Sequence, residues 1–94
     1  MPQRTKKDPW DVEFGAFVRR LRMSRYWTIT ELARRTNYTP AYIGILEKGA
    51  NSASSTTLFN LAAAFDMRLS ELIRMFEDEQ NASRAAAQQT AAKP

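Results

Sequence analysis

Apolar side chains in the first third of the chain recur every three or four positions, which is the spacing of one face of an α-helix. In the segment from Asp11 to Ser24 these side chains are Phe14, Phe17, Val18 and Leu21. We therefore expect a helix over residues 11–24 that packs its apolar face on the helices that follow.

The stretch from Thr28 to Glu47 reads as two short helices joined by a tight turn. Thr28 and Glu31 form a capping box, in which the hydroxyl and the carboxylate each accept a hydrogen bond from a free helix N–H. This pattern predicts a helix that begins near Ile29. The helix should end at Asn37, because asparagine tolerates the left-handed conformation that a sharp turn requires.

A second helix is predicted directly after this turn. Thr39 can cap it, and Pro40 stands at the first helical position, where its missing N–H would have had no partner. The helix should run from Ala41 to about Lys48, since Gly49 is suited to ending it. Two helices in this order form a helix-turn-helix, which we interpret as a DNA-binding element.

Two more helices follow in the apolar pattern. Ser54 or Ser55 should cap the first of them. Its buried stripe consists of Leu58, Leu61, Ala62 and Phe65. The last helix should open at Ser70 and Glu71 and end near Glu77 or a little beyond.

The residues after Asn81 are rich in alanine, which favours a helix, but they contain no apolar stripe to bury. We expect a frayed or disordered tail there. The chain therefore divides into a flexible basic arm over residues 1–9, a helix-turn-helix domain over residues 10–79, and a flexible or frayed tail over residues 80–94.

The composition narrows the possible functions. A length of 94 residues suits one small domain. The hydrophobic residues make up 44% of the chain but form no long apolar run, so we expect neither a transmembrane segment nor a signal peptide. We therefore expect a cytoplasmic protein. The lack of cysteine and histidine removes disulfides, thiol nucleophiles, imidazole bases and ordinary zinc sites. We therefore expect a protein that is not an enzyme and uses no cofactor or metal.

The formal charge of +4 is unevenly distributed along the chain. From Arg4 to Lys48 there are ten basic residues against five acidic ones, whereas from Asp66 to Glu79 there are two against five. The basic half contains the helix-turn-helix. A DNA backbone attracts such a surface, with an affinity that falls as salt is added.

The first nine residues contribute Arg4, Lys6 and Lys7 to this charge. A basic arm of this kind can reach a minor groove or an adjacent phosphate. A terminal segment without any role has the same composition, so the sequence leaves both interpretations open.

A set of residues spread along the chain carries a resemblance to a known family. They are Arg22, Leu32-Ala33, Tyr42-Ile43, Leu46-Glu47-Lys48-Gly49, Leu58, Leu61-Ala62, Leu69 and Leu72. Over Phe14 to Phe76 their order and spacing resemble the phage-repressor type of helix-turn-helix regulator, the lambda repressor and Cro class known as the XRE family. The resemblance implies an all-α, compact five-helix bundle with the helix-turn-helix at its second and third helices. Some proteins of this type, such as the controller proteins of restriction–modification systems, are little more than the domain itself.

The resemblance implies that bases are read from the exposed face and N-terminal end of the second motif helix, which enters the major groove. The corresponding residues are Thr39, Pro40, Ala41, Gly44 and Ile45. None of them is an arginine, glutamine or asparagine, which contact a base through two hydrogen bonds. Readout would instead use one hydrogen bond from Thr39, apolar contacts with thymine methyl groups, and DNA shape.

Phosphate contacts are expected around the same helix. The candidates are Thr28, Thr30, Arg34, Arg35, Tyr42, Lys48, Asn51 and Ser52. The family usually has a phosphate-contacting glutamine where this chain has Ile29, so Thr28, Thr30 and the helix N-terminal amides would replace it. The alternatives are that the two arginines are simply solvent-facing and that the tyrosine is a half-buried ring packed on the preceding helix.

Four further residues carry structural expectations. The resemblance implies that Arg22 and Glu47 pair beneath the surface and brace the first helix against the end of the third. Trp27 is expected in the core. Tyr26 should be exposed, or held in a strained turn conformation that glycine or asparagine suits better.

One such domain covers only a half-site, so we expect a homodimer on half-sites about 34 Å apart. The last helix is more apolar than one buried face requires. The candidates for the dimer surface are Ile73, Met75 and Phe76, whichever remains outside the core, unless the core takes all of them. The sequence thus predicts a regulator of transcription, a repressor, that binds double-stranded DNA at an inverted repeat. The apolar reading helix leaves an alternative, a protein-binding module (an antitoxin or co-regulator) with weak or nonspecific DNA binding.

Overall fold

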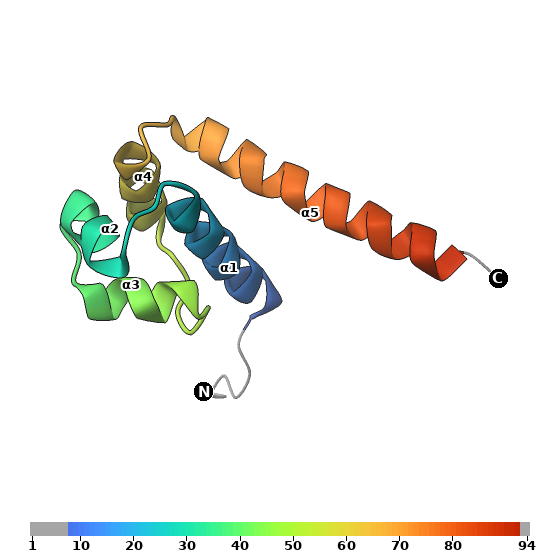
Figure 1. The fold of residues 1–94 in the computed structure, drawn as a ribbon, viewed down its shortest axis with the longest axis horizontal. Helices are drawn as coiled ribbons and strands as arrows, with labels where there is room; N and C mark the ends of the chain where they lie inside the picture. Colours follow the sequence, from blue (N-terminus) through green and yellow to red (C-terminus); the bar gives the residue numbers. More distant parts are fainter. Residues whose placement is uncertain (1–7, 93–94) are drawn as a thin grey trace.

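The computed structural model describes residues 8–92, and these residues form five α-helices and no β-strand. The helices are α1 (Pro9–Ser24), α2 (Ile29–Thr36), α3 (Pro40–Glu47), α4 (Ser55–Ala64) and α5 (Leu69–Ala92). Figure 1 shows α1 to α4 gathered together, with α5 starting beside α4 and extending past the other helices. This arrangement confirms the predicted all-α, five-helix fold.

Side-chain caps fix where the first four helices begin. In each case the residue before the helix accepts a hydrogen bond from a backbone N–H of the first turn; these residues are Asp8, Thr28, Thr39 and Ser54. The predicted caps at Thr28 and Thr39 are confirmed, and it is Ser54 rather than Ser55 that caps α4. The first helix begins two residues earlier than predicted, because Asp8 caps it and a proline suits its first position.

Three residues other than glycine hold left-handed backbone conformations in the described turns. They are Tyr26 (φ 60°), Asn37 (φ 64°) and Asp66 (φ 59°). Asn37 ends α2 as predicted, and the next residue, Tyr38, donates its N–H to the carbonyl of Ala33 at 3.0 Å. Tyr26 is 95% exposed, so it is both exposed and in the strained conformation.

The core lies between the five helices. It consists of Phe14, Phe17, Val18, Leu32, Ala33, Ile43, Leu46, Leu61, Ala62, Phe65, Leu72 and Phe76. The apolar stripes predicted for α1 and α4 are confirmed, except that Leu21 and Leu58 are only partly buried. Trp27 is half-buried against this core, with its ring stacked on Phe65 at 5.2 Å between centroids.

Aromatic rings join α1 to α5. Phe76 of α5 is only 3% exposed. Its ring centroid lies 5.2 to 5.4 Å from those of Trp10, Phe14 and Phe17. Farther along α5, the carboxylate of Glu79 accepts a hydrogen bond from Arg20 of α1 at 2.6 Å. These contacts anchor the first half of α5 to α1.

The fifth helix is longer than predicted. It begins at Leu69, where the carboxylate of Glu71 accepts a hydrogen bond at 2.8 Å from the N–H of Arg68, and it continues to Ala92. The predicted end near Glu77 was wrong. Alanine, glutamine and arginine have high helix propensity, so they prolong a helix whose first half is already packed without needing a buried face of their own.

The close approach of α1 and α3 requires glycine at position 15. A Cβ atom there would meet the carbonyl oxygens of Leu46 and Glu47, the second of them at 2.7 Å. At the end of α3, Gly49 has a φ of 73°, and a Cβ atom on it would lie 2.5 Å from the Cα of Val12. Both glycines allow α3 to lie directly on α1, which fixes the position of the helix.

Candidate nucleic-acid interface

The inner side of α3 is tied to the core and to a buried ion pair. Ile43 and Leu46 are buried in the core. Beside them, the carboxylate of Glu47 accepts two hydrogen bonds from the guanidinium of Arg22, at 2.7 and 3.1 Å. A third guanidinium nitrogen donates to the carbonyl of Trp27 at 2.8 Å. The first and third helices and the turn after α1 are therefore held by one arginine.

The outer side of α3 is exposed and has little hydrogen-bonding capacity. Pro40 and Ala41 are exposed, as is Ile45 at 40%. A Cβ atom on Gly44 would meet nothing within 4 Å, so this position opens onto free space. Thr39 is exposed, and its hydroxyl accepts the N–H of Tyr42 at 3.0 Å, which leaves the hydroxyl proton to donate. The five base-reading candidates thus share one mostly apolar side of the helix.

Only half of the predicted capping box is formed at α2. The hydroxyl of Thr28 accepts the N–H of Glu31 at 3.1 Å. The carboxylate of Glu31 does not return to the N–H of Thr28; it binds Arg34 and, at 2.7 Å, Arg35. The reciprocal bond was wrongly predicted because two guanidinium groups one turn away compete for the same carboxylate.

These ion pairs also hold the two arginines that were candidates for phosphate contacts. The hydrogen bond from Arg34 lowers the pKa of Glu31, and the same contact raises the pKa of Arg34. The guanidinium carbon of Arg35 lies 4.1 Å from the centre of the Trp27 ring, a cation–π contact. Because that ring stacks on Phe65, Arg35 faces the end of α4. A DNA phosphate would have to compete with these contacts for both arginines.

The remaining phosphate candidates lie around α3 in different environments. Thr28, Thr30, Lys48 and Asn51 are exposed. Ser52 is exposed too, but its hydroxyl donates to the buried carboxylate of Asp11 at 2.6 Å. Tyr42 is half-buried, as its alternative interpretation predicted, although its ring contacts Tyr38 in the turn and its hydroxyl lies 3.2 Å from that of Thr57 on α4.

The net positive charge of this chain does not come from the residues that the structure describes. All ten acidic residues lie within residues 8–92. Of the 14 basic residues, four lie outside that range, namely Arg4, Lys6, Lys7 and Lys93. Residues 8–92 therefore carry ten basic and ten acidic side chains. Three of the four outlying cations belong to the predicted basic arm, most of which falls outside the described residues.

The structure separates the three candidates for a dimer surface. Phe76 is buried against α1, so it is not available at a surface, and Ile73 is partly buried against the core. Met75 is 37% exposed. It lies on a shallow groove along one side of α5, whose lining is Glu71, Arg74, Met75, Asp78, Glu79 and Ala82. The sequence could not make this separation, because neighbouring positions on one helix differ only in which face packs.

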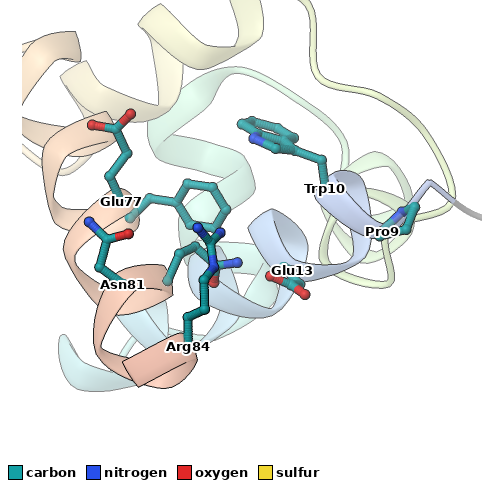
Figure 2. Close-up of a pocket in the computed structure, with 8 residues that line it drawn as sticks. Pro9, Trp10, Glu13, Glu77, Asn81 and Arg84 are labelled. Carbon is teal, nitrogen blue, oxygen red and sulfur yellow. The ribbon is translucent and has the colours of Figure 1, made fainter. Parts of the chain in front are cut away.

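A second groove, which the sequence did not suggest, runs between the start of α1 and the second half of α5. It has a volume of about 510 Å³ and is lined by Pro9, Trp10, Glu13, Phe76, Glu77, Gln80, Asn81 and Arg84. Figure 2 shows that its polar groups come from both helices. Its walls are some seventy residues apart in the sequence, so no local pattern could have revealed it.

Two negative findings apply to residues 8–92. None of the described helices is long and apolar enough to cross a membrane. No group of three or more acidic, histidine or cysteine side chains in this part of the chain is arranged to hold a metal ion.

Several solved structures resemble this chain. One is the restriction-modification controller protein C.AhdI from Aeromonas hydrophila, which is 31% identical with a TM-score of 0.61, over 65% of this chain and 92% of the controller. Another is the clp gene regulator ClgR from Corynebacterium glutamicum, which is 24% identical with a TM-score of 0.72, over 92% of this chain and 90% of the regulator. At that identity, the second likeness shows the fold alone. No curated protein sequence matches this chain.

The helix-turn-helix domain family matches residues 13–74, a range that extends from the second turn of α1 to the first half of α5. The matched region includes both capped helices of the motif, the Arg22 and Glu47 pair, and the exposed face of α3. The chain belongs to the helix-turn-helix domain family, in its phage-repressor or XRE-like form, and has the fold of a DNA-binding transcription regulator.

Proposed function

We propose that this protein is a sequence-specific regulator of transcription, a repressor, that binds an inverted repeat in double-stranded DNA as a homodimer. The observation that carries the proposal is the contrast between the two sides of α3. The inner side is fixed by the core and by a buried ion pair, while the outer side is exposed. A short helix held in this way is suited to entering a major groove.

The outer side of α3 would read DNA by close contact rather than by paired hydrogen bonds. The open space over Gly44 allows the helix backbone to approach the base edges. Pro40, Ala41 and Ile45 supply methyl and methylene groups, which suit the methyl group of thymine. Thr39 supplies one hydrogen bond. A bidentate contact discriminates against a wrong base by about 1–3 kcal/mol. Because α3 has no such contact to offer, DNA shape and dimerisation would have to supply more of the sequence specificity.

Phosphate binding would come from groups on both sides of α3. Thr28 and Thr30 lie at the start of α2, where the free N–H groups favour an anion. Tyr42, Lys48, Asn51 and Ser52 lie along α3 and just after it. Because residues 8–92 carry equal numbers of acidic and basic groups, the terminal cations Arg4, Lys6 and Lys7 would supply the long-range attraction. Removing them should reduce the salt dependence of DNA affinity.

The groove around Met75 is the proposed dimer surface. Arg74 makes no ion pair within residues 8–92, and Asp78 and Glu79 lie one turn further along the same helix. In two antiparallel copies of α5, each Arg74 would face the acidic turn of the other. The substitution Met75→Glu should convert the dimer to a monomer in analytical ultracentrifugation, and an unchanged mass would remove this surface from consideration.

The comparisons support the regulatory role. The protein from Aeromonas hydrophila is a restriction-modification controller protein. The match covers 92% of the controller and 65% of this chain, at 31% identity. A regulator of transcription that binds an inverted repeat needs both a DNA-reading surface and a way to assemble two half-site readers. The exposed side of α3 and the groove on α5 would fill these two roles.

The decisive experiment is selection of bound sequences from a random pool of double-stranded DNA at near-physiological salt. An enriched inverted repeat with half-sites about one helical turn apart would support the proposal. Enrichment of a single half-site would support DNA reading without dimerisation. Enrichment of no sequence would contradict sequence-specific binding.

The exposed apolar side of α3 also favours a second candidate function. Ile45, at 40% exposure, lies with Pro40 and Ala41 on a surface that a protein could cover as well as DNA could. In that case the protein would be an antitoxin or co-regulator. Nonspecific binding through phosphates is also steeply salt-dependent, so the distinguishing measurement is the ratio of affinities for the selected repeat and for an unrelated duplex at the same salt concentration. A large ratio supports base reading, whereas a ratio near one favours the protein-binding candidate.

A further inference from the structure

A cluster of hydroxyl groups connects the helix-turn-helix to α4. Thr57 is 5% exposed, and its hydroxyl oxygen lies 3.1 to 3.3 Å from three other hydroxyls, those of Ser54, Tyr42 and Tyr38. The side-chain amide of Asn60 donates to the Tyr38 hydroxyl at 2.9 Å. Residues from α4, from α3 and from the turn between α2 and α3 therefore meet at one threonine.

The contacts at Thr57 are mutually compatible. A threonine hydroxyl has one proton and two lone pairs. It can accept from Tyr38 and Ser54 while it donates to Tyr42, which uses its full capacity. The rings of the two tyrosines also touch, with centroids 4.9 Å apart. Because a partly satisfied polar network inside a protein is costly, removing the central hydroxyl should affect every member.

The cluster adds a polar attachment to the core contacts and the ion pair that already hold α3. The C-terminal end of α3 is fixed to α1 by Glu47 and Arg22. Tyr42 stands five residues earlier, roughly 7.5 Å along the helix axis. Thr57 holds that earlier point through the tyrosine hydroxyl. The apolar contacts of Ile43 and Leu46 are non-directional, whereas hydrogen bonds at two separated points along the helix are directional and define its tilt.

We propose that Thr57 is a positioning residue that sets the tilt of α3 relative to α4 and α5. The inference rests on the proposed function and goes beyond it, because it assigns a role in recognition to a residue that does not face the partner. The fourth helix packs on α5, which carries the proposed dimer surface. In a dimer, Thr57 would therefore fix how the two α3 helices are placed with respect to each other, and hence the half-site spacing that the protein accepts.

The test compares Thr57→Val, which keeps the shape of the side chain and removes the hydroxyl, with Thr57→Ser, which keeps the hydroxyl. The matched control is Thr36→Val. Thr36 is another buried threonine, whose hydroxyl donates to the carbonyls of Leu32 and Ala33. It also accepts, at 3.4 Å, from the N–H of Tyr38, but that N–H has a shorter hydrogen bond to Ala33, and the Thr36 hydroxyl bonds to none of the hydroxyls around Thr57. Affinities are measured for the selected inverted repeat and for the same repeat with one base pair inserted between the half-sites.

We expect Thr57→Val to lose about tenfold in its preference for the correct spacing, the factor that corresponds to one hydrogen bond. Thr57→Ser and Thr36→Val should keep the wild-type preference. If Thr57→Val keeps it as well, or if Thr36→Val loses as much, the positioning role is wrong. Should the valine variant fail to fold, Tyr42→Phe removes one arm of the cluster from a half-buried position and is expected to shift the preference in the same direction.

Hydrogen exchange in the free protein separates failure of this inference from failure of the proposed function. Loss of the Thr57 hydroxyl should speed amide exchange in the first half of α3 without speeding it at Glu47. Exchange unchanged in α3 would overturn the positioning role whether or not the protein binds DNA. Conversely, faster exchange in a protein that binds no DNA would support the role of Thr57 and overturn the proposed function.

Discussion

The two sides of the eight-residue helix α3 differ in burial and in hydrogen bonding. On the inner side, Ile43 and Leu46 are buried, and the carboxylate of Glu47 has a guanidinium partner. On the outer side, Ala41 and Gly44 present almost no side chain, and nothing in residues 8–92 covers them. The contacts of the inner side fix the position of the helix, so the residues of the outer side are not needed for packing and are available to contact a partner.

Two glycines and two sets of ion pairs extend this comparison. Gly15 faces the inner side of α3, where a Cβ atom would strike backbone, while Gly44 faces open space. The buried pair of Arg22 and Glu47 likewise contrasts with the exposed pairs that Glu31 makes. Matched substitutions at these positions therefore measure the inner and outer sides separately.

The largest effect is expected from Arg22→Ala. It leaves the carboxylate of Glu47 buried without its partner, which should lower the free energy of unfolding by about 3–5 kcal/mol. Thermal or urea denaturation measures this loss. Sequence preference should survive wherever the variant is still folded, because neither residue lies on the outer side of α3.

A control removes both charges of this pair. Arg22→Met combined with Glu47→Leu should recover much of the stability, since no unpaired charge remains buried. A melting curve of Arg22→Ala identical to that of the wild type would show that the pair does not brace α1 against α3.

A smaller loss is expected from Gly15→Ala. The added Cβ atom would meet two carbonyl oxygens of α3, which are backbone atoms and yield only if the helices separate. We expect a net loss of about 1–3 kcal/mol in the free energy of unfolding, even though alanine favours the helix itself. Denaturation measures it, and a stabilised variant would contradict the close approach of α1 and α3.

The opposite sign is expected at Gly44. A Cβ atom there meets nothing, and alanine is a better helix former, so Gly44→Ala should raise the free energy of unfolding by up to about 1 kcal/mol. DNA affinity should fall, because the methyl group occupies the space into which the base edges would come. If affinity is unchanged while stability rises, the partner does not approach α3 at this position.

The smallest effect concerns Glu31. Its pKa is lowered from the ordinary value of 4.5, chiefly by the hydrogen bond from Arg34, so the ionised form is favoured in the folded protein. The resulting stabilisation is present above pH 4.5 and is lost as the pH falls through the lowered value. Glu31→Gln should therefore show a shallower loss of stability below about pH 4.5 than the wild type in denaturation series. The effect should be small because both partners are solvent-exposed, and identical pH profiles would show that these pairs add nothing.

Much of the fold follows from signals that lie close together in the sequence. Thr28, Thr39 and Ser54 each meet an N–H three residues later, so the starts of α2, α3 and α4 are local events. Asn37 ends α2 for an equally local reason, its tolerance of a positive φ. Apolar spacing likewise identifies which residues of α1 and α4 are buried.

The tertiary structure decided what these signals leave open. Glu31 binds two arginines instead of closing its capping box, and α5 continues to Ala92 because packing of its first half supports the rest. Of the candidates on α5, Phe76 is buried and Met75 is left exposed. The meeting of Tyr38, Tyr42 and Thr57 had no signature in the chain at all. Caps and periodicity are set by neighbours within one helical turn, whereas these outcomes depend on groups up to several tens of residues apart that only folding brings together.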